Sequence, residues 1–155
     1  KNILKIDEFQ FKCSIGAKGI KKNKIEGDLC TPKGRYKLKN LFYRDDRKKK
    51  FNCALSTIKI KKNMGWCDDP NSRYYNSLIK INKNLKYEKL FRKDHLYDFL
   101  IEINHNHKKK PFAGSAIFIH LTKNYKPTKG CIALKEKDFL ILLKLVTKKT
   151  YLNII

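Results

Sequence analysis

The sequence predicts a single domain that is mainly β (an α+β chain), with one helix close to its C-terminal end. The chain has 155 residues, the usual size of one domain and enough to bury a hydrophobic core. Several stretches alternate apolar and polar residues with the period of a strand. One stretch near the C-terminus has the longer period of a helix. We therefore treat residues 1–155 as one domain.

The first half of the chain contains three strand-like stretches. Residues 9–15 alternate apolar and polar side chains and end at Gly16, which suggests a strand closed by a turn. Residues 35–43 alternate in the same way, and residues 56–61 place their apolar side chains on one face. The basic run at 44–50 is expected to be a solvated loop.

The second half is expected to contain a central strand, the helix and the last strand. Residues 96–104 are apolar enough for a central strand, and residues 115–120 form another apolar strand. From residue 135 onward the period becomes that of an amphipathic helix. Its apolar face consists of Phe139, Leu142, Leu143 and Val146. Residues 150–155 would close the chain as a strand, and residues 88–93 would form a short helical turn.

Residues 63–75 are rich in turn formers, yet they carry Trp66, the only tryptophan of the chain. A large aromatic side chain in a loop either anchors the loop to the core or lines a binding cleft. Anchoring is the commoner role, and substrate binding is the alternative for Trp66. Arg73 and Arg35 are candidate contacts for a substrate carboxylate, because guanidinium groups bind carboxylates through paired hydrogen bonds.

The chain is strongly basic. It has 37 Lys and Arg against 14 Asp and Glu, a formal net charge of +23, and its lysines are spread along the whole sequence. Such a surface attracts polyanions, and nucleic acid, anionic lipid and an acidic envelope polymer all fit. A lysine-biased composition explains the same charge equally well. We therefore expect no specific nucleic-acid binding.

The cysteine and histidine spacings favour neither a disulfide framework nor a metal site. The chain has five cysteines, Cys13, Cys30, Cys53, Cys67 and Cys131. They form no CxxC pair, and any disulfide scheme leaves one unpaired. His105 and His107 form an HxH, but no third ligand occurs at a recognisable spacing. We expect an exposed turn at these histidines, and neither a metal nor a cofactor.

Two residues stand out as a candidate catalytic pair. His120 ends the apolar strand at 115–120, and Cys131 follows Gly130 at the end of a polar loop. A thiol and an imidazole on rigid elements can act as nucleophile and base, because the thiolate is the reactive species. Gly130 allows a tight turn, and the N–H groups of Gly130 and Cys131 could stabilise an oxyanion. A buried structural cysteine and a structural histidine are the alternative interpretation.

Two motifs occur in a characteristic order. The turn Thr31-Pro32-Lys33-Gly34-Arg35-Tyr36 has the pattern Thr-Pro-x-Gly-x-aromatic. Ile119-His120 is followed by Thr128-Lys129-Gly130-Cys131-Ile132, which has the pattern of an Ile-His strand end and a Ser/Thr-x-Gly-Cys loop. With these motifs the chain resembles the L,D-transpeptidase family with the YkuD-type catalytic domain, from about residue 13 to the C-terminus.

The resemblance implies a YkuD-like β-sandwich of mixed sheets with a helix after the nucleophile loop, and acyl transfer on peptidoglycan stem peptides. Cys131 would attack the carbonyl of an L-centre in a tetrapeptide and release the terminal D-Ala, with His120 as the base. An amine of a neighbouring stem would then accept the acyl group. Gly130 and Cys131 would supply the oxyanion donors, and Thr128 corresponds to the Ser/Thr of the loop.

The chain departs from the family pattern at three points. Lys129 stands where most members have a histidine directly before Gly-Cys, and Ala133 stands where Arg or Asn is common. The interval from His120 to Cys131 is shorter than usual, which indicates a short-loop subgroup. The charge of Lys129 could favour a thiolate or bind a substrate carboxylate.

Two alternatives to transpeptidation remain at this level. Water could resolve the acyl-enzyme, which would make the chain an L,D-carboxypeptidase, or the chain could be a non-catalytic polyanion-binding protein. The family resemblance implies the periplasm or cell envelope, whereas the N-terminal residues lack the apolar core of a signal peptide, which leaves a cytoplasmic location open. We expect a monomer without a membrane span, with peptidoglycan stem peptides and an anionic envelope polymer as partners.

Overall fold

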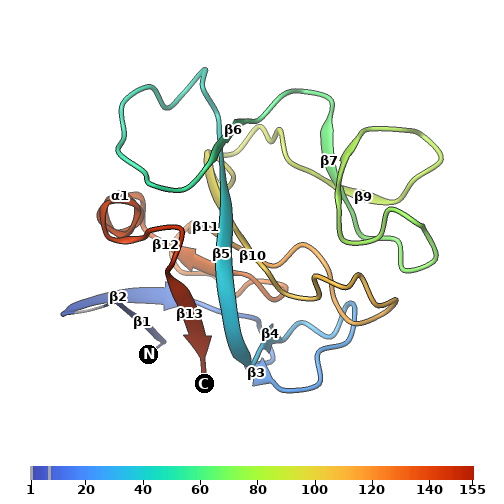
Figure 1. Cartoon of the computed structure of the whole chain (residues 1–155), viewed down its shortest axis with the longest axis horizontal. Coiled ribbons are helices and arrows are strands. Elements are labelled where there is room, and N and C mark those ends of the chain that lie inside the picture. Colours follow the sequence, from blue (N-terminus) through green and yellow to red (C-terminus); the bar gives the residue numbers. More distant parts are fainter. Residues whose placement is uncertain (1, 7) are drawn as a thin grey trace.

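The computed structural model describes residues 2–6 and 8–155, and its main sheet has eight strands (Figure 1). In spatial order these are β1 (Ile3–Ile6), β2 (Phe9–Ser14), β12 (Ile132–Leu134), β11 (Phe118–Leu121), β10 (Phe99–Ile103), β5 (Gly34–Tyr43) and β13 (Tyr151–Ile154), with β6 (Thr57–Lys59) paired to β5. The strands next to the candidate cysteine and histidine, β12 and β11, therefore lie inside the sheet.

Parallel and antiparallel pairs are mixed in this sheet. β11 and β12 run parallel, with His120 opposite Ala133, whereas β10 pairs antiparallel with both β11 and β5. A parallel pair cannot be joined by a tight hairpin, and residues 122–131 form the longer connection between β11 and β12. The predicted mainly β fold with mixed sheets is confirmed.

The helix α1 (Glu136–Leu145) packs on one face of the main sheet, as the helical period predicts. Its Phe139 ring stacks on Phe99 of β10, with 5.6 Å between the ring centroids. Ile119 and Ile132 belong to the same apolar cluster. Burying one side chain of this size stabilises the fold by about 1.5–3 kcal/mol. α1 therefore supports β11 and β12 on the sheet face that carries Ile119 and Ile132.

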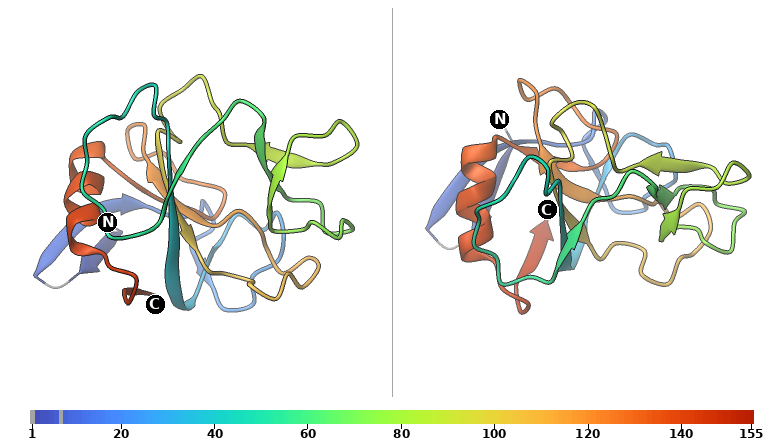
Figure 2. Two further views of the ribbon diagram at one scale, coloured as in Figure 1. Left: turned by 45° about the horizontal axis from the view of Figure 1, so that its top comes forward. Right: turned by 90° about the horizontal axis from the view of Figure 1, so that it is seen from above.

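A three-stranded sheet covers the opposite face and consists of β7 (Met64–Cys67), β8 (Leu78–Lys80) and β9 (Tyr87–Lys89). In Figures 1 and 2, β7 and β9 lie on the far side of β5 from α1. Trp66 makes edge-on contacts with Phe42 and Phe118, at 6.2 and 5.1 Å between centroids. Because successive strand residues alternate in direction, Phe118 and His120 point away from the cluster that contains Ile119.

Two short elements complete the fold. β3 (Ile20–Lys21) and β4 (Thr31–Pro32) form a small parallel pair.

β1 and β13 are the two edge strands of the main sheet, yet both line one cavity of about 550 Å³. The sheet therefore curls so that its two edge strands line the same cavity.

Two local predictions were wrong. Residues 88–93 form no helical turn, because β9 occupies the start of that stretch. Residues 63–75 were expected to be a loop but contain β7. The helix begins where its period predicts, at Glu136, and the short strand β12 precedes it. β7, β9 and β12 have only three or four residues each, which is too few for an alternating pattern to be recognised.

The basic run at 44–50 is not simply a solvated loop. Arg44 is 3% exposed, and its guanidinium donates two hydrogen bonds to Asp46, at 2.8 and 2.6 Å, and one to the carbonyl of Arg92 at 2.6 Å. The guanidinium also lies 3.6 Å from the centroid of the Phe91 ring. Arg44 thus joins two loops, because a buried guanidinium is retained only where its donors are satisfied.

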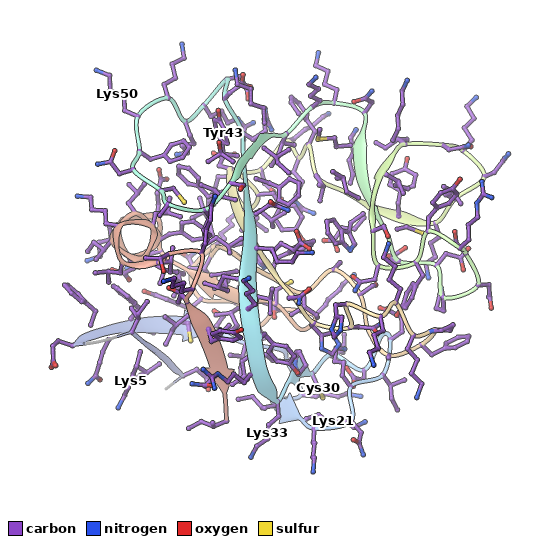
Figure 3. All side chains as sticks on the ribbon, viewed as in Figure 1. Lys5, Lys21, Cys30, Lys33, Tyr43 and Lys50 are labelled. Atoms are coloured by element: carbon purple, nitrogen blue, oxygen red, sulfur yellow. The ribbon has the colours of Figure 1, made fainter. Side chains whose placement is uncertain are left out.

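The remaining positive charge is distributed around the molecule. Figure 3 shows the side chains of Lys5, Lys33 and Lys50 extending outward from different parts of the fold. No helix among the described residues is long and apolar enough to cross a membrane.

Candidate active site

β11 holds His120 in one orientation and one tautomer. The residue is 7% exposed, and its ring packs edge-on against Tyr97, with 5.3 Å between centroids. Nδ1 lies 2.7 Å from the carbonyl oxygen of Leu121. A carbonyl can only accept a hydrogen bond, so Nδ1 carries the proton and Nε2 keeps the lone pair. His120 is therefore preset as a base through Nε2.

Cys131 lies opposite Phe118, directly before β12. The register of β11 and β12 puts the thiol on the same sheet face as His120, two positions away along the strand. The S–H group donates to the carbonyl of Ala116 at 3.2 Å, and the N–H of Phe118 donates to Sγ at 3.4 Å. The structure thus brings the thiol and the imidazole to one face of the sheet. Among the described residues, however, the thiol is hydrogen-bonded to backbone groups and not to His120.

Gly130 and Thr128 shape the turn in front of the cysteine. Gly130 has φ +147°, and a Cβ at this position would lie 2.9 Å from the carbonyl oxygen of Cys30, so a larger residue would strain the turn. The Thr128 hydroxyl donates to the carbonyl of Cys131 at 2.6 Å and accepts from the N–H of Gly130 at 3.1 Å. To donate to an oxyanion, as predicted, the N–H of Gly130 would therefore have to break its hydrogen bond to the Thr128 hydroxyl.

The two candidate catalytic side chains are neutral in this state. Burial, with a further contribution from the charge of Glu88, raises the pKa of the Cys131 thiol to about 12. Burial lowers the pKa of His120 to about 4. Both shifts have the same cause, because a low-dielectric environment disfavours the charged form of each group. Near neutral pH the pair is thus a thiol and an imidazole, and not a thiolate–imidazolium ion pair.

Glu88 and Tyr97, which no sequence pattern indicated, lie beside the pair. The Tyr97 hydroxyl donates to Oε1 of Glu88, and its ring contacts Phe118, at 6.3 Å between centroids, as well as His120. Glu88 is paired with Trp66 in the register of β7 and β9. Burial raises the pKa of Glu88. No local pattern could have revealed this cluster, because pairing between distant segments assembles it.

Trp66 both anchors its segment and borders a cavity. Its Nε1 donates to Oδ1 of Asn76 at 2.9 Å, and the same oxygen accepts from the N–H of Ala116 at 3.2 Å. Trp66 also lines a cavity of about 240 Å³ together with Glu102 and His107. The anchoring role is visible directly, and the substrate-binding role of Trp66 stays a prediction.

The other candidate substrate contacts lie at different distances from the thiol. Lys129 is exposed, and its charge acts to lower the pKa of Glu88. Arg73 lies in the exposed loop between β7 and β8. Arg35 lies at the edge where β5 pairs with β13, and its guanidinium is 4.5 Å from the ring centroid of Tyr151. None of these three basic side chains forms a hydrogen bond or ion pair with Cys131 or His120 in the described part of the chain, and their substrate-binding roles stay predictions.

The two histidines of the HxH have separate environments. Nε2 of His105 lies 2.9 Å from the carbonyl of Ala113, and its ring packs edge-on against Tyr36 at 5.5 Å. His107 is exposed. In the described part of the chain, no three His, Cys, Asp or Glu residues are grouped so that they could hold a metal ion.

Comparison with known proteins gives one match. A family model described as YkuD, the L,D-transpeptidase catalytic domain, matches residues 5–154, nearly the whole chain. No curated protein and no solved structure was found to match. The matched range includes the strands that carry His120 and Cys131 and the sheet that covers them.

Proposed function

Because the chain belongs to the YkuD family of L,D-transpeptidase catalytic domains, which acts on peptidoglycan peptides, we propose that it transfers acyl groups between stem peptides through a thioester on Cys131. The observation that carries the proposal is the shared sheet face of Cys131 and His120, with the lone pair of Nε2 on the imidazole. A nucleophile and a base on rigid neighbouring strands are what covalent acyl transfer requires.

In the first half-reaction, Nε2 of His120 takes the thiol proton as Sγ attacks the carbonyl carbon of the L-centre. The C–S bond forms, and the carbonyl oxygen becomes an oxyanion that backbone N–H groups stabilise. The N–H of Phe118 already donates to Sγ and favours negative charge there. The C–N bond to the terminal D-Ala then breaks, and His120 returns its proton to the leaving amine.

In the second half-reaction, an amine of a neighbouring stem attacks the thioester carbonyl. A new C–N bond forms, the C–S bond breaks, and the sulfur recovers a proton to give the thiol. Water in place of the amine would give hydrolysis, which is the carboxypeptidase outcome. We place both half-reactions in the cell envelope, where peptidoglycan stems lie.

The burial of the thiol sets a condition on this mechanism. Cys131 is 8% exposed, so a bound stem peptide must displace part of its cover before the carbonyl can reach Sγ. Exchange of the hydrogen bond to Ala116 would free the S–H group to face Nε2 of His120. A non-catalytic protein would show the same buried, neutral cysteine, so the test has to address the reactivity of this thiol.

Acylation by a carbapenem tests the proposal, because the β-lactam carbonyl traps a nucleophile as a stable acyl-enzyme. We expect intact-mass spectrometry to show one adduct on the wild-type protein and none on Cys131→Ala. Cys13→Ala is the matched control, since Cys13 is also buried and burial raises its thiol pKa to about 11. This variant should react like wild type. A wild-type protein without an adduct, or an adduct that persists in Cys131→Ala, would overturn the proposal.

A further inference from the structure

The three-stranded sheet carries two carboxylates on the face that lies against the proposed nucleophile. Glu88 of β9 is paired with Trp66 of β7, and cross-strand partners share a face. Asp68 lies two positions beyond Trp66, which returns its side chain to that face, and its N–H continues the ladder between the two strands. Trp66 packs on Phe118, whose N–H donates to the reactive sulfur. Glu88 lies close enough to the thiol for its charge to help raise the pKa of Cys131, and Asp68 lies close enough to Glu88 for its charge to help raise the pKa of Glu88.

Glu88 is connected to the catalytic pair and forms no close ion pair among the described residues. Its carboxylate accepts from the Tyr97 hydroxyl, and the Tyr97 ring contacts His120. Arg92 lies 5.1 Å from the same ring, yet its guanidinium is held by Asp94 through two hydrogen bonds of 2.8 and 2.6 Å. Arg92 and Lys129 lower the pKa of Glu88 only from a longer distance, so among the described residues no cation directly contacts its carboxylate.

Asp68 supplies an independent indication of a ligand. Its Oδ1 is buried and has no hydrogen-bond partner in the described part of the chain. A buried carboxylate oxygen without a donor destabilises the protein, and the charge of Lys86 acts on Asp68 without a hydrogen bond to Oδ1, so an N–H donor of a ligand would be favourable there. A cation with several N–H donors would satisfy Asp68 and Glu88 together.

We propose that Glu88 and Asp68 bind the ammonium group of the acyl acceptor, and that Glu88 accepts the first proton that this group loses. The proposal rests on the acyl transfer proposed above and names the residues that select its second substrate. The ligand class is a primary alkylammonium, such as the side-chain amine of a stem peptide. Trp66 and Tyr97 flank Glu88 with aromatic rings, which also attract cations.

The proton balance of aminolysis gives Glu88 its role. An ammonium group has three protons and the amide product keeps one, so two must leave. Glu88 takes the first, which frees the nitrogen lone pair to attack the thioester carbonyl. The C–N bond forms and the C–S bond breaks, and the second proton passes through Nε2 of His120 to the departing sulfur. Because burial raises the pKa of Glu88, its carboxylate is a better proton acceptor than an exposed one.

Hydrolysis provides the internal reference for a test. Water is neutral, so its attack requires neither an ammonium site nor removal of an ammonium proton. Aminolysis and hydrolysis also start from the same acyl-enzyme, so a change in the acylation rate cancels in their ratio. The ratio of amide to hydrolysis product therefore reports on the acceptor site alone.

The experiment mixes the protein with a tetrapeptide stem and butylamine, which is an ammonium ion at pH 7, and measures both products by mass spectrometry. We expect Glu88→Gln to lower the amide-to-hydrolysis ratio about a hundredfold, the low end of the contribution of a positioned proton acceptor. With methoxyamine, which is neutral at pH 7, the ratio should change little. Asp68→Asn should lower the butylamine ratio, and Glu136→Gln, on the far helix, should keep the wild-type ratio.

The outcomes separate the two proposals. If wild type forms no acyl-enzyme on Cys131, the acyl transfer itself is wrong and the acceptor site with it. If wild type forms the acyl-enzyme but Glu88→Gln keeps the wild-type ratio with butylamine, only the acceptor site is wrong. An equal loss with butylamine and methoxyamine would also reject it, because that pattern indicates general damage to the site.

A measurement on wild type alone covers the case in which the variants do not fold. Tetramethylammonium carries the charge of the acceptor but has no proton to lose and cannot attack. It should suppress amide formation from butylamine without slowing hydrolysis, whereas sodium chloride at the same ionic strength should suppress it less. Equal effects of the two salts would reject the ammonium site.

Discussion

At the scale of single residues, the site combines rigid placement with electrical neutrality. The backbone fixes both candidate catalytic groups, because Nδ1 of His120 is hydrogen-bonded to the carbonyl of Leu121, and Sγ of Cys131 is hydrogen-bonded to the backbone of Ala116 and Phe118. Burial then keeps the imidazole in its neutral form, with a proton on Nδ1 only, and keeps the thiol in its S–H form. A resting thiol of this kind resists oxidation and alkylation, since both reactions require the thiolate. Reactivity would appear only when a substrate rearranges these contacts.

The neutrality of His120 makes a prediction about stability. Its pKa is about 4 in the folded protein, against an ordinary value of 6.5. As the pH falls below 6.5 the unfolded chain binds the proton first, so the free energy of unfolding should decrease between about pH 6.5 and pH 4, by about 3 kcal/mol in total. Urea unfolding across this range should show the decrease in wild type and lose this part of it in His120→Gln.

His95 provides the control for this measurement, because it is exposed. His95→Gln should keep the pH dependence of wild type. If His120→Gln and wild type lose stability in parallel as the pH falls, His120 is not the buried neutral group described above.

At the scale of elements, the sequence was informative where a pattern is long or contiguous. The ten residues of β5 and the apolar face of α1 show clear periods, and the nucleophile motif places His120 and Cys131 within one short stretch. β7 and β9 are too short to show a period, so the covering sheet could not be recognised. Glu88 and Tyr97 were missed for the same reason, because pairing of β9 with β7 brings them to the thiol. Contacts between distant segments depend on the whole fold.

α1 allows a test of what supports β11 and β12. Leu143 is 1% exposed and belongs to the cluster behind these strands, whereas Ile141 on the same helix is 38% exposed. Leu143→Ala should lower the free energy of unfolding by about 2–5 kcal/mol, because it removes buried methyl groups and leaves a cavity. Ile141→Ala should cost clearly less. Thermal and urea unfolding would measure both changes, and equal losses would contradict the packing described for α1.

At the scale of the whole molecule, the excess of basic residues remains on the surface. Several of the 14 acidic side chains are already engaged in ion pairs, as Asp28 is with Lys24, Asp98 with Arg47 and Glu102 with Lys39. The remaining lysines extend from different parts of the fold instead of gathering at one edge (Figure 3). Such a distribution attracts a polyanion from any direction. Retention near an anionic envelope polymer would therefore require no dedicated binding site.

Binding to a long polyphosphate tests this distributed attraction. We expect the logarithm of the binding constant to fall linearly and steeply with the logarithm of the salt concentration, because binding releases counterions. Lys5, Lys33 and Lys50 lie at separate places on the molecule, so Lys5→Glu, Lys33→Glu and Lys50→Glu should weaken binding to similar, moderate extents. Lys50→Arg keeps the charge and should bind like wild type. If one of the three glutamate variants abolished binding while the other two kept it, the lysine excess would instead contain a defined polyanion site.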